Sequence, residues 1–197
     1  MRSNKSKKIT KKIIAGEFKG KTLTIPSKTT TRSSKAIVLE SFFNTIQFDI
    51  IDANFVEVFS GSGSIGLEAL SRGAKQIYFM ERDKDALKIL KQNISLTDPD
   101  RCEVYGGDSF SNIKSIINIL KSKSEDAYFY IDPPFSIREG MEDIYDKTIE
   151  LIANLPKECV KLIIIEHMSG LELDKNINGY ELQKSKKFGN TTLSYYL

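Results

Sequence analysis

Short apolar runs alternate with longer helical patterns along the chain from residue 53 onward. The runs of about five apolar residues are typical of buried parallel strands. The stretches between them carry apolar residues three or four positions apart, which is typical of amphipathic helices. This alternation predicts an α/β fold with a mostly parallel sheet and helices on both faces. The predicted strands are 54–59, 76–80, 102–105, 127–131 and 160–166, and the predicted helices are 65–71, 84–94, 110–120 and 141–155.

The two ends of the chain follow other patterns. Residues 180–187 and 191–196 flank Gly189-Asn190 and predict an antiparallel strand pair, which brings the sheet to seven strands. At the other end, two short β-like runs flank a turn with two glycines and predict a small hairpin. The hairpin strands are expected at 12–15 and 22–25, followed by a helix at 35–46, while residues 1–11 are expected to be disordered.

Charge is distributed unevenly between these regions. Residues 1–35 hold eleven Lys and Arg against the single acid Glu17, whereas residues 36–197 hold 18 Lys and Arg against 25 acids. A basic arm on an acidic body favours a polyanionic partner such as nucleic acid over a merely solubilising tail. The side chains expected to contact phosphates are Lys11, Lys12, Lys19, Lys21 and Arg32.

Composition excludes several other classes of protein. The chain has 197 residues, one histidine, His167, and two cysteines, Cys102 and Cys159, that lie far apart. A zinc site or a disulfide framework is therefore not expected. No apolar run approaches the roughly 18 residues of a membrane span, and the basic N-terminus lacks the apolar core of a secretion signal. We therefore expect a cytoplasmic protein with no membrane partner and no metal.

A glycine-rich segment follows the strand predicted at 54–59. Gly61, Gly63 and Gly66 fit the spacing G-x-G-x-x-G, which lets backbone N–H groups approach a ligand closely. Glu81 ends the next strand, 20 residues after Gly61, where a carboxylate can accept both hydroxyls of a ribose. The pattern fits NAD as well as S-adenosylmethionine, and a plain connecting turn is the simpler alternative.

The next two strand ends carry further polar residues. Asp108, beside Ser109, can accept a hydrogen bond from an adenine amino group, or it can simply cap the following helix. Asp132-Pro133-Pro134-Phe135 closes the fourth strand. Prolines leave carbonyls as acceptors without N–H donors. A carboxylate beside such carbonyls can bind an amino group attached to a ring, and Phe135 offers a face for stacking on that ring.

Together these segments resemble class I S-adenosylmethionine-dependent methyltransferases of the amino-methylating type. The match is closer still to the bacterial 16S rRNA guanine-N2 methyltransferases of the RsmD family. The long glycine-loop block is the most specific part of it. Ser33, Ala36 and Leu39 depart from the Pro, Asp and Arg usual in that family, in a segment expected to contact RNA. The matching segments are 13–21, 40–44, 59–74 and 188–196, together with Asp132-Pro133-Pro134-Phe135.

The resemblance implies a Rossmann-like fold and assigns roles to residues. Residues 49–197 would form the S-adenosylmethionine-binding catalytic domain, and residues 1–48 a basic extension for RNA contact. The substrate would be 16S rRNA in an assembled or assembling small subunit, with S-adenosylhomocysteine as product, no metal, and a monomeric enzyme. Implied catalytic residues are Asp132, Pro133, Pro134 and Phe135; implied cofactor contacts are Glu57, Phe59, Ser60, Gly61, Ser62, Gly63, Gly66, Glu81, Arg82, Asp108 and Ser109.

Three alternatives remain at this point. An N6-adenine DNA methyltransferase would share the Asp132 motif, although such enzymes generally carry a target-recognition domain that this chain has no room for. An NAD-linked dehydrogenase would share the glycine loop and Glu81, but nothing here resembles a hydride-transfer site. A non-catalytic RNA-binding assembly protein would keep the fold without needing an intact Asp132 motif.

Overall fold

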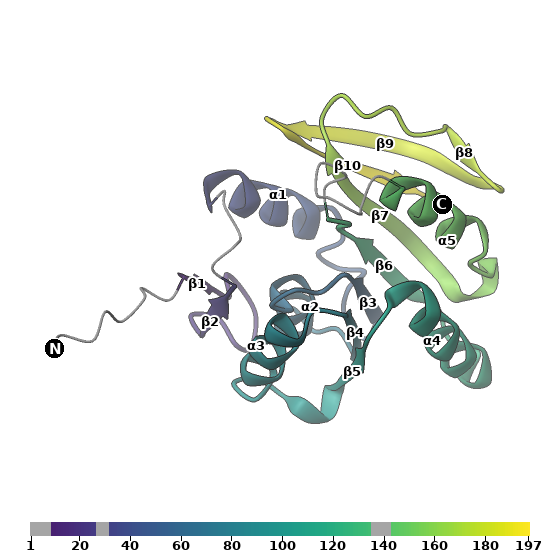
Figure 1. The fold of residues 1–197 in the computed structure, drawn as a ribbon. Coiled ribbons are helices and arrows are strands. Elements are labelled where there is room, and N and C mark those ends of the chain that lie inside the picture. Colours follow the sequence, from purple (N-terminus) through teal and green to yellow (C-terminus); the bar gives the residue numbers. More distant parts are fainter. Residues whose placement is uncertain (1–8, 27–31, 135–142) are drawn as a thin grey trace, which may run out of the picture.

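A computed structural model describes residues 9–26, 32–134 and 143–197 (Figure 1). Its main sheet has eight strands, which in chain order are β3 (Asn54–Val58), β4 (Gln76–Glu81), β5 (Cys102–Gly106), β6 (Ala127–Ile131), β7 (Val160–Met168), β8 (Asn176–Ile177), β9 (Tyr180–Phe188) and β10 (Thr191–Tyr196). Their order across the sheet is β5-β4-β3-β6-β7-β10-β9-β8. The first five are parallel, and β10 runs antiparallel to both neighbours. This confirms the predicted mostly parallel sheet with an antiparallel closing pair.

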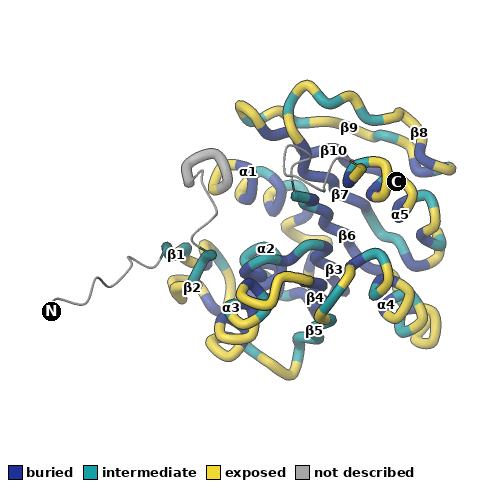
Figure 2. The backbone as a smooth tube through the Cα atoms, in the orientation of Figure 1, coloured by how far each residue is buried: buried dark blue, intermediate teal, exposed yellow. Residues whose placement is uncertain are grey.

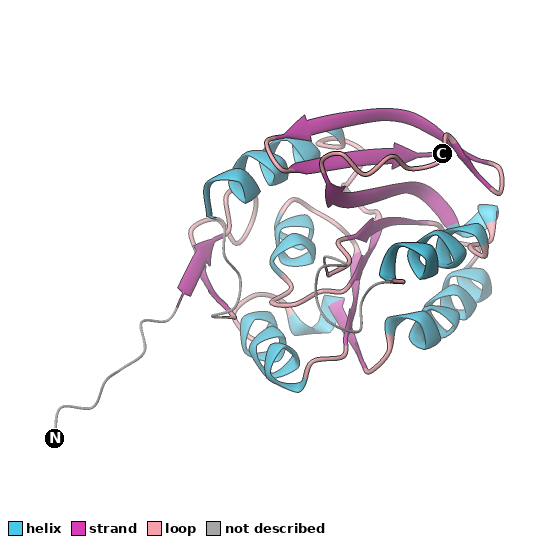
Figure 3. Cartoon of the chain, turned by 45° about the horizontal axis from the view of Figure 1, so that its top comes forward, coloured by secondary structure: helices cyan, strands magenta, loops and turns pink. Residues whose placement is uncertain are grey.

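Helices cover both faces of the sheet (Figure 3). Alternate residues of a strand point to opposite faces. In β3, Phe55 therefore joins one core with α1, α2 and α3, while Val56 joins a second core with α4 and α5. The tube in Figure 2 is buried along β3 and β6 because both faces are covered. The helices are α1 (Arg32–Thr45), α2 (Ser64–Ser71), α3 (Lys84–Ile94), α4 (Ser109–Lys123) and α5 (Ile144–Ala153), with single 3-10 turns at Pro99–Arg101 and Lys157–Cys159.

The predicted number of seven strands is one too low. The additional strand, β8, has two residues and pairs with the start of β9. Asn178 and Gly179 connect them with φ values of 48° and 90°. Two positive φ angles are what the type I′ turn of a two-residue hairpin requires, and Asn-Gly is its preferred sequence. The dipeptide was a signal for this strand that the apolar pattern alone did not reveal.

The N-terminal hairpin forms, but its first strand begins earlier than predicted. It consists of β1 (Ile9–Lys12) and β2 (Thr22–Ile25), which pair antiparallel. The strand predicted at 12–15 is wrong because Ile14 and Ala15 donate their N–H groups to the carboxylate of Glu68 on α2, at 2.8 and 3.1 Å. Those donors are therefore unavailable to a strand partner, and the chain turns onto α2 instead.

Helix α1 packs against the sheet rather than standing apart. Leu39, Phe42, Phe43 and Ile46 are buried in the core that also contains Phe55 of β3. Leu39 occupies a position where the RsmD family usually has Arg, and here it contributes apolar contacts. The described residues before position 49 thus share a core with β3, and the division of roles at residue 48 stays a prediction.

Candidate active site

The carboxyl ends of the parallel strands meet at one edge of the sheet, where ligands of such sheets bind. The order of strands reverses between β3 and β6, since the chain runs outward from β3 to β5 before crossing to β6. Val58 and Ile131 are register partners at the ends of these two strands. The glycine loop after β3 and the Asp132 motif after β6 therefore lie side by side at the point where a binding crevice is expected.

The glycine loop is held in a left-handed conformation at three positions. Phe59, Gly61 and Gly63 have φ values of 64°, 55° and 75°. Ser60 ties the loop to the sheet, because its Oγ donates to the Glu57 carbonyl at 2.7 Å and accepts from the N–H of Met80 at 3.0 Å. A Cβ atom at Gly61 would meet nothing within 4 Å, so this part of the loop backbone faces open space.

Glu81 connects the loop to the end of β4. Its Oε2 accepts from the N–H of Gly61 at 2.6 Å, and its Oε1 accepts from the N–H of Asp83 at 2.7 Å. The side chain is mostly buried, with 8 % of the residue exposed. The structure therefore brings Glu81 together with the glycine loop, as the sequence predicts. Its role toward a ribose stays a prediction.

Glu57 lies behind the loop and caps helix α2. Its carboxylate accepts from the N–H of Gly66 at 2.8 Å and from that of Ile65 at 3.4 Å. Burial raises the pKa of Glu57 to about 8, against the opposing effects of these N–H groups and of the Lys11 charge. A Cβ at Gly66 would lie 2.9 Å from the Glu57 carboxylate and 2.5 Å from the Phe79 ring, so glycine is required for this close packing.

We expect stability to fall as pH rises because of Glu57. Its folded-state pKa of about 8 exceeds the ordinary value of 4.5. Between these two values the unfolded chain has released the proton and the folded chain retains it, so a higher pH favours unfolding. The slope attributable to this group is at most about 1.4 kcal/mol per pH unit. Urea unfolding at pH 5 to 8 should show a weaker decline in Glu57→Gln than in the unaltered protein; equal declines would contradict this origin.

Asp108 and its neighbours lie at the end of β5. The Asp108 carboxylate accepts from the N–H of Ser111 at 3.2 Å and from its hydroxyl at 2.9 Å, and so caps α4. Asp108 is therefore the helix cap that the sequence offered as one of two interpretations. Its contact with an adenine remains a prediction. Ser109 is buried beside it, and Arg82 after β4 is exposed.

Carboxylates gather around the motif that follows β6. Pro133 is buried, while Asp132 and Pro134 are partly exposed; Phe135 lies outside the described residues. Tyr130 donates its hydroxyl to Glu166 of β7 at 2.6 Å. Burial first, and then the charges of Glu166 and Asp132, raise the pKa of Tyr130 well above its usual range. Glu166 and Asp132 give the edge of β6 and β7 a negative potential that favours a positively charged group.

His167 follows Glu166 but has a structural role. Its two ring nitrogens contact the Met168 carbonyl at 3.0 Å and the Ser194 hydroxyl at 2.9 Å, so Nδ1–H donates and Nε2 accepts. Burial lowers the pKa of His167, which keeps the ring neutral. The contact with Ser194 joins β7 to β10, and the two contacts account for the position of the histidine in the structure.

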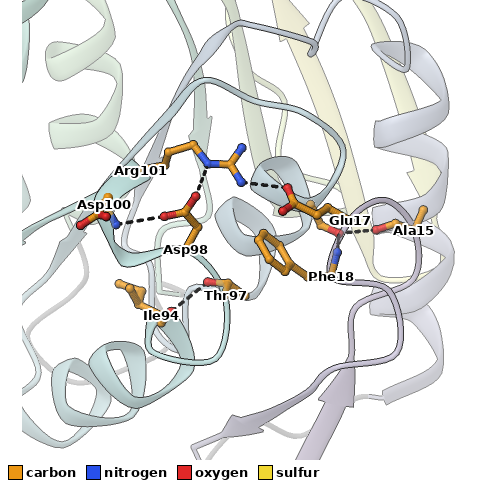
Figure 4. A network of polar contacts seen from close by, with 9 residues as sticks. Ala15, Glu17, Phe18, Ile94, Thr97, Asp98, Asp100 and Arg101 are labelled. Carbon is orange, nitrogen blue, oxygen red and sulfur yellow. Dashed lines mark hydrogen bonds and ion pairs between the residues drawn. The ribbon is translucent and has the colours of Figure 1, made fainter.

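The turn of the N-terminal hairpin docks on the segment that precedes β5 (Figure 4). Arg101 pairs with Glu17 at 2.9 Å and with Asp98 at 2.7 Å, and its guanidinium lies 5.9 Å from the centre of the Phe18 ring. Lys21 donates to the carbonyl of Leu96. These contacts join the hairpin turn to the segment between α3 and β5.

The lysines predicted to bind RNA differ in their surroundings. Lys12, Lys19 and Lys21 are exposed. Lys11 is half-buried and donates to the Ser64 hydroxyl at 3.4 Å. The side chain of Arg32 lies outside the described residues. RNA contact by all five stays a prediction.

The family described as "Conserved hypothetical protein 95" matches residues 11–197. The chain belongs to this family. Among its relatives, the "Ribosomal RNA small subunit methyltransferase D" of Buchnera aphidicola (subsp. Baizongia pistaciae) is 30 % identical over 98 % of this chain and 94 % of its own length. The protein of that name from Escherichia coli K12 is 30 % identical over 72 % of this chain and 66 % of its own. The predicted resemblance to the RsmD family of class I methyltransferases is confirmed.

A solved structure supports the same assignment. The Escherichia coli protein named "Putative methyltransferase yhhF" has a TM-score of 0.74, is 25 % identical, and matches 95 % of this chain and 97 % of its own. The RsmD-family chain is thus a methyltransferase with a Rossmann-like fold, and a dehydrogenase is not supported. No helix in the described part of the chain is long and apolar enough to cross a membrane. Within those same residues no group of three or more His, Cys, Asp or Glu is placed to hold a metal ion.

Proposed function

We propose that the protein transfers a methyl group from S-adenosylmethionine to the exocyclic N2 of one guanine in 16S rRNA. The observation that carries the proposal is the adjacency of the Asp132-Pro133-Pro134 segment to the glycine loop, across the paired ends of β6 and β3. A motif suited to a ring amino group thus lies beside a loop suited to the cofactor. The relatives named for the small ribosomal subunit support rRNA as substrate.

The residues at the strand ends fit S-adenosylmethionine. The loop backbone at Gly61 faces open space, and the Glu81 carboxylate lies against it. Glu81 would accept the ribose hydroxyls, and Asp108 would bind the adenine amino group. When bound, this cofactor supplies a methyl group that is already activated by a positively charged sulfur, so the proposed reaction needs no metal. The remaining proposed contacts are Glu57, Phe59, Ser60, Ser62, Gly63, Gly66, Arg82 and Ser109.

Asp132 would orient the amino group that is methylated. The lone pair of a guanine amino group is delocalised into the ring, so this nitrogen is a weak nucleophile. Hydrogen bonds from its N–H groups to the Asp132 carboxylate and the Pro133 carbonyl would hold it in line and accommodate the positive charge that develops on it. Proton loss can follow the transfer, so Asp132 does not have to act as a full general base. Pro134 would fix the backbone, and Phe135 would stack on the base.

Residues 1–48 would provide the RNA contacts and residues 49–197 the catalytic site. The guanine must leave its helix or loop to reach the crevice. The exposed lysines of the hairpin would then bind phosphates around it, together with Arg32. We further propose that the protein acts as a cytoplasmic monomer on rRNA in an assembled or assembling small subunit.

Replacing Lys12 and Lys19 with glutamine should weaken RNA binding and reduce its salt dependence. Each lost phosphate contact lowers the slope of log K against log salt by about 0.7 to 0.9, so two contacts change it by roughly 1.5. Titrations of 16S rRNA at several salt concentrations measure this slope. Lys114→Gln with Lys123→Gln is the matched control, since both lysines are exposed on α4, which packs on the opposite face of the sheet from the first core. A slope unchanged by the hairpin pair would reject these lysines as RNA contacts.

Methyl transfer to defined RNA tests the function directly. Labelled S-adenosylmethionine is offered with 16S rRNA, or with small subunits from an unmethylated strain, and the product is digested to nucleosides. N2-methylguanosine at one site is the expected result. N6-methyladenosine would overturn the choice of guanine. No transfer to any RNA, with cofactor still bound, would favour the non-catalytic assembly protein instead.

A further inference from the structure

Asn93 is a buried polar residue in the last turn of α3, with 1 % of its surface exposed. Its side-chain amide contacts one residue of the hairpin twice. The N–H of Thr24 donates to Oδ1 at 2.9 Å, and Nδ2 donates to the Thr24 carbonyl at 2.9 Å. The Asn93 side chain therefore pairs with β2 in the way that a neighbouring strand would.

The same amide also reaches the glycine loop. Nδ2 of Asn93 donates to the carbonyl of Ser62 at 2.9 Å. Ser62 lies between Gly61 and Gly63, in the segment proposed to hold the cofactor. Both N–H groups of this amide are thus used, one on the hairpin and one on the loop. A buried amide with its donors satisfied in this way fixes the relative position of the two segments.

A second contact joins the hairpin to the far side of the loop. Lys11 of β1 donates to the hydroxyl of Ser64, the first residue of α2, at 3.4 Å. The charge of Lys11 also acts on the Glu57 carboxylate behind the loop. Since β1 and β2 are paired, the hairpin acts as one unit that contacts Ser64 directly and is connected to Ser62 through Asn93.

The opposite side of the loop is fixed by the cofactor residue Glu81, through the N–H of Gly61. Glu81 also binds the N–H of Asp83, the residue that caps the start of α3. Helix α3 therefore begins at the proposed ribose carboxylate and ends at the amide that holds the hairpin. The hairpin that carries the proposed RNA contacts is thus connected to one side of the glycine loop, and the proposed ribose carboxylate, Glu81, to the other side.

We propose that Asn93 is a positioning residue that couples RNA binding on the hairpin to cofactor binding at the glycine loop. This inference rests on the proposed function. Phosphates bound by Lys12 and Lys19 restrain the hairpin, and Asn93 passes that restraint to the backbone of Ser62. The loop is then held in the geometry that receives the cofactor. Because coupling between binding sites is reciprocal, the cofactor tightens RNA binding by the same factor.

Calorimetric titration of S-adenosylhomocysteine, with and without saturating 16S rRNA, measures the coupling. In the unaltered protein we expect RNA to tighten this affinity about tenfold, within the usual range of roughly 5- to 150-fold for coupled sites. In Asn93→Leu, RNA should tighten the affinity for S-adenosylhomocysteine by less than about twofold. The affinity measured without RNA should stay within about threefold of the value for the unaltered protein. Asn154→Leu is the matched control. Its side chain lies at the end of α5, donates to the Glu150 carbonyl of its own helix, and should leave the gain intact.

Steady-state kinetics separate positioning from a structural defect. At saturating RNA, the KM of Asn93→Leu for S-adenosylmethionine should rise about tenfold, with kcat within about twofold, because the catalytic groups after β6 are untouched. A general loss of structure would lower kcat as well. If melting shows Asn93→Leu to be unfolded, Ser64→Ala decides the matter. It removes the hydroxyl that accepts from Lys11, leaves Lys11 itself in place, and should reduce the RNA-induced gain in affinity severalfold.

Two results would overturn the coupling. One is that RNA tightens the affinity for S-adenosylhomocysteine as much in Asn93→Leu, or in the variant that replaces it, as in the unaltered protein. The other is that RNA does not tighten this affinity in the unaltered protein. Both are distinguishable from failure of the proposed function. If the unaltered protein forms N2-methylguanosine but Asn93→Leu retains the gain, only the coupling is wrong. If no RNA is methylated at all, the proposed function is wrong.

Discussion

Replacing Asp132 with alanine is expected to lower the rate of methyl transfer by about 10²- to 10³-fold, the usual cost of losing one group that stabilises developing charge. Asp132 follows β6 at the reversal of strand order and is partly exposed. Its carboxylate would hold the amino group of the base and balance the positive charge that grows there. The Glu81 side of the site is unchanged by the substitution, so affinity for S-adenosylhomocysteine should stay within about threefold.

The comparison that isolates this role uses two further variants. Asp132→Asn keeps one side-chain oxygen as an acceptor and should fall between alanine and the unaltered protein. Asp126→Ala removes an exposed carboxylate immediately before β6, at the opposite end of the same strand, and should transfer normally. Tritium-methyl transfer to 16S rRNA gives the rates, and calorimetry gives the cofactor affinities. Near-normal transfer by Asp132→Ala would remove Asp132 from the mechanism.

Elements with strong local signals were predicted with the correct bounds. Helix α3 and strand β6 occupy the predicted residues 84–94 and 127–131. In α3 a capping aspartate, Asp83, precedes a clear apolar face, and β6 is an uninterrupted apolar run. Both are determined by neighbours in sequence. Strand β1 was misplaced because its end is decided by Glu68, more than fifty residues away, and no local pattern contains that information.

The site also combines features that the sequence predicts with features that depend on distant residues. The predicted strand ends do come together, since parallel strands present their carboxyl ends at one edge, and this follows from topology alone. The hydrogen-bond partners of the polar side chains, in contrast, do not follow from topology. Glu81 binds the backbone of Gly61, and Tyr130 binds Glu166, across neighbouring strands. The role of Asn93 was also missed. Its one sequence signal was an amide beside the apolar face of α3, which cannot specify the segments it joins.

Replacing Glu68 with alanine is expected to destabilise the fold by about 3–5 kcal/mol, the usual cost of removing one partner of a buried ion pair. Glu68 is 1 % exposed. Its carboxylate accepts from the N–H groups of Ile14 and Ala15 and pairs with Arg72 at 2.8 Å. The alanine variant leaves these three donors without their acceptor, and two of them lie in the segment that connects the two strands of the hairpin.

This loss should affect function as well as stability, because Glu68 anchors the hairpin to α2. Urea unfolding gives the change in free energy. Glu150→Ala, at an exposed position of α5, is the matched control and should change it by less than about 0.5 kcal/mol. At temperatures where the Glu68→Ala protein remains folded, RNA affinity should fall while affinity for S-adenosylhomocysteine without RNA is retained. If that variant unfolds at the same urea concentration as the control, the buried carboxylate does not hold the hairpin in place.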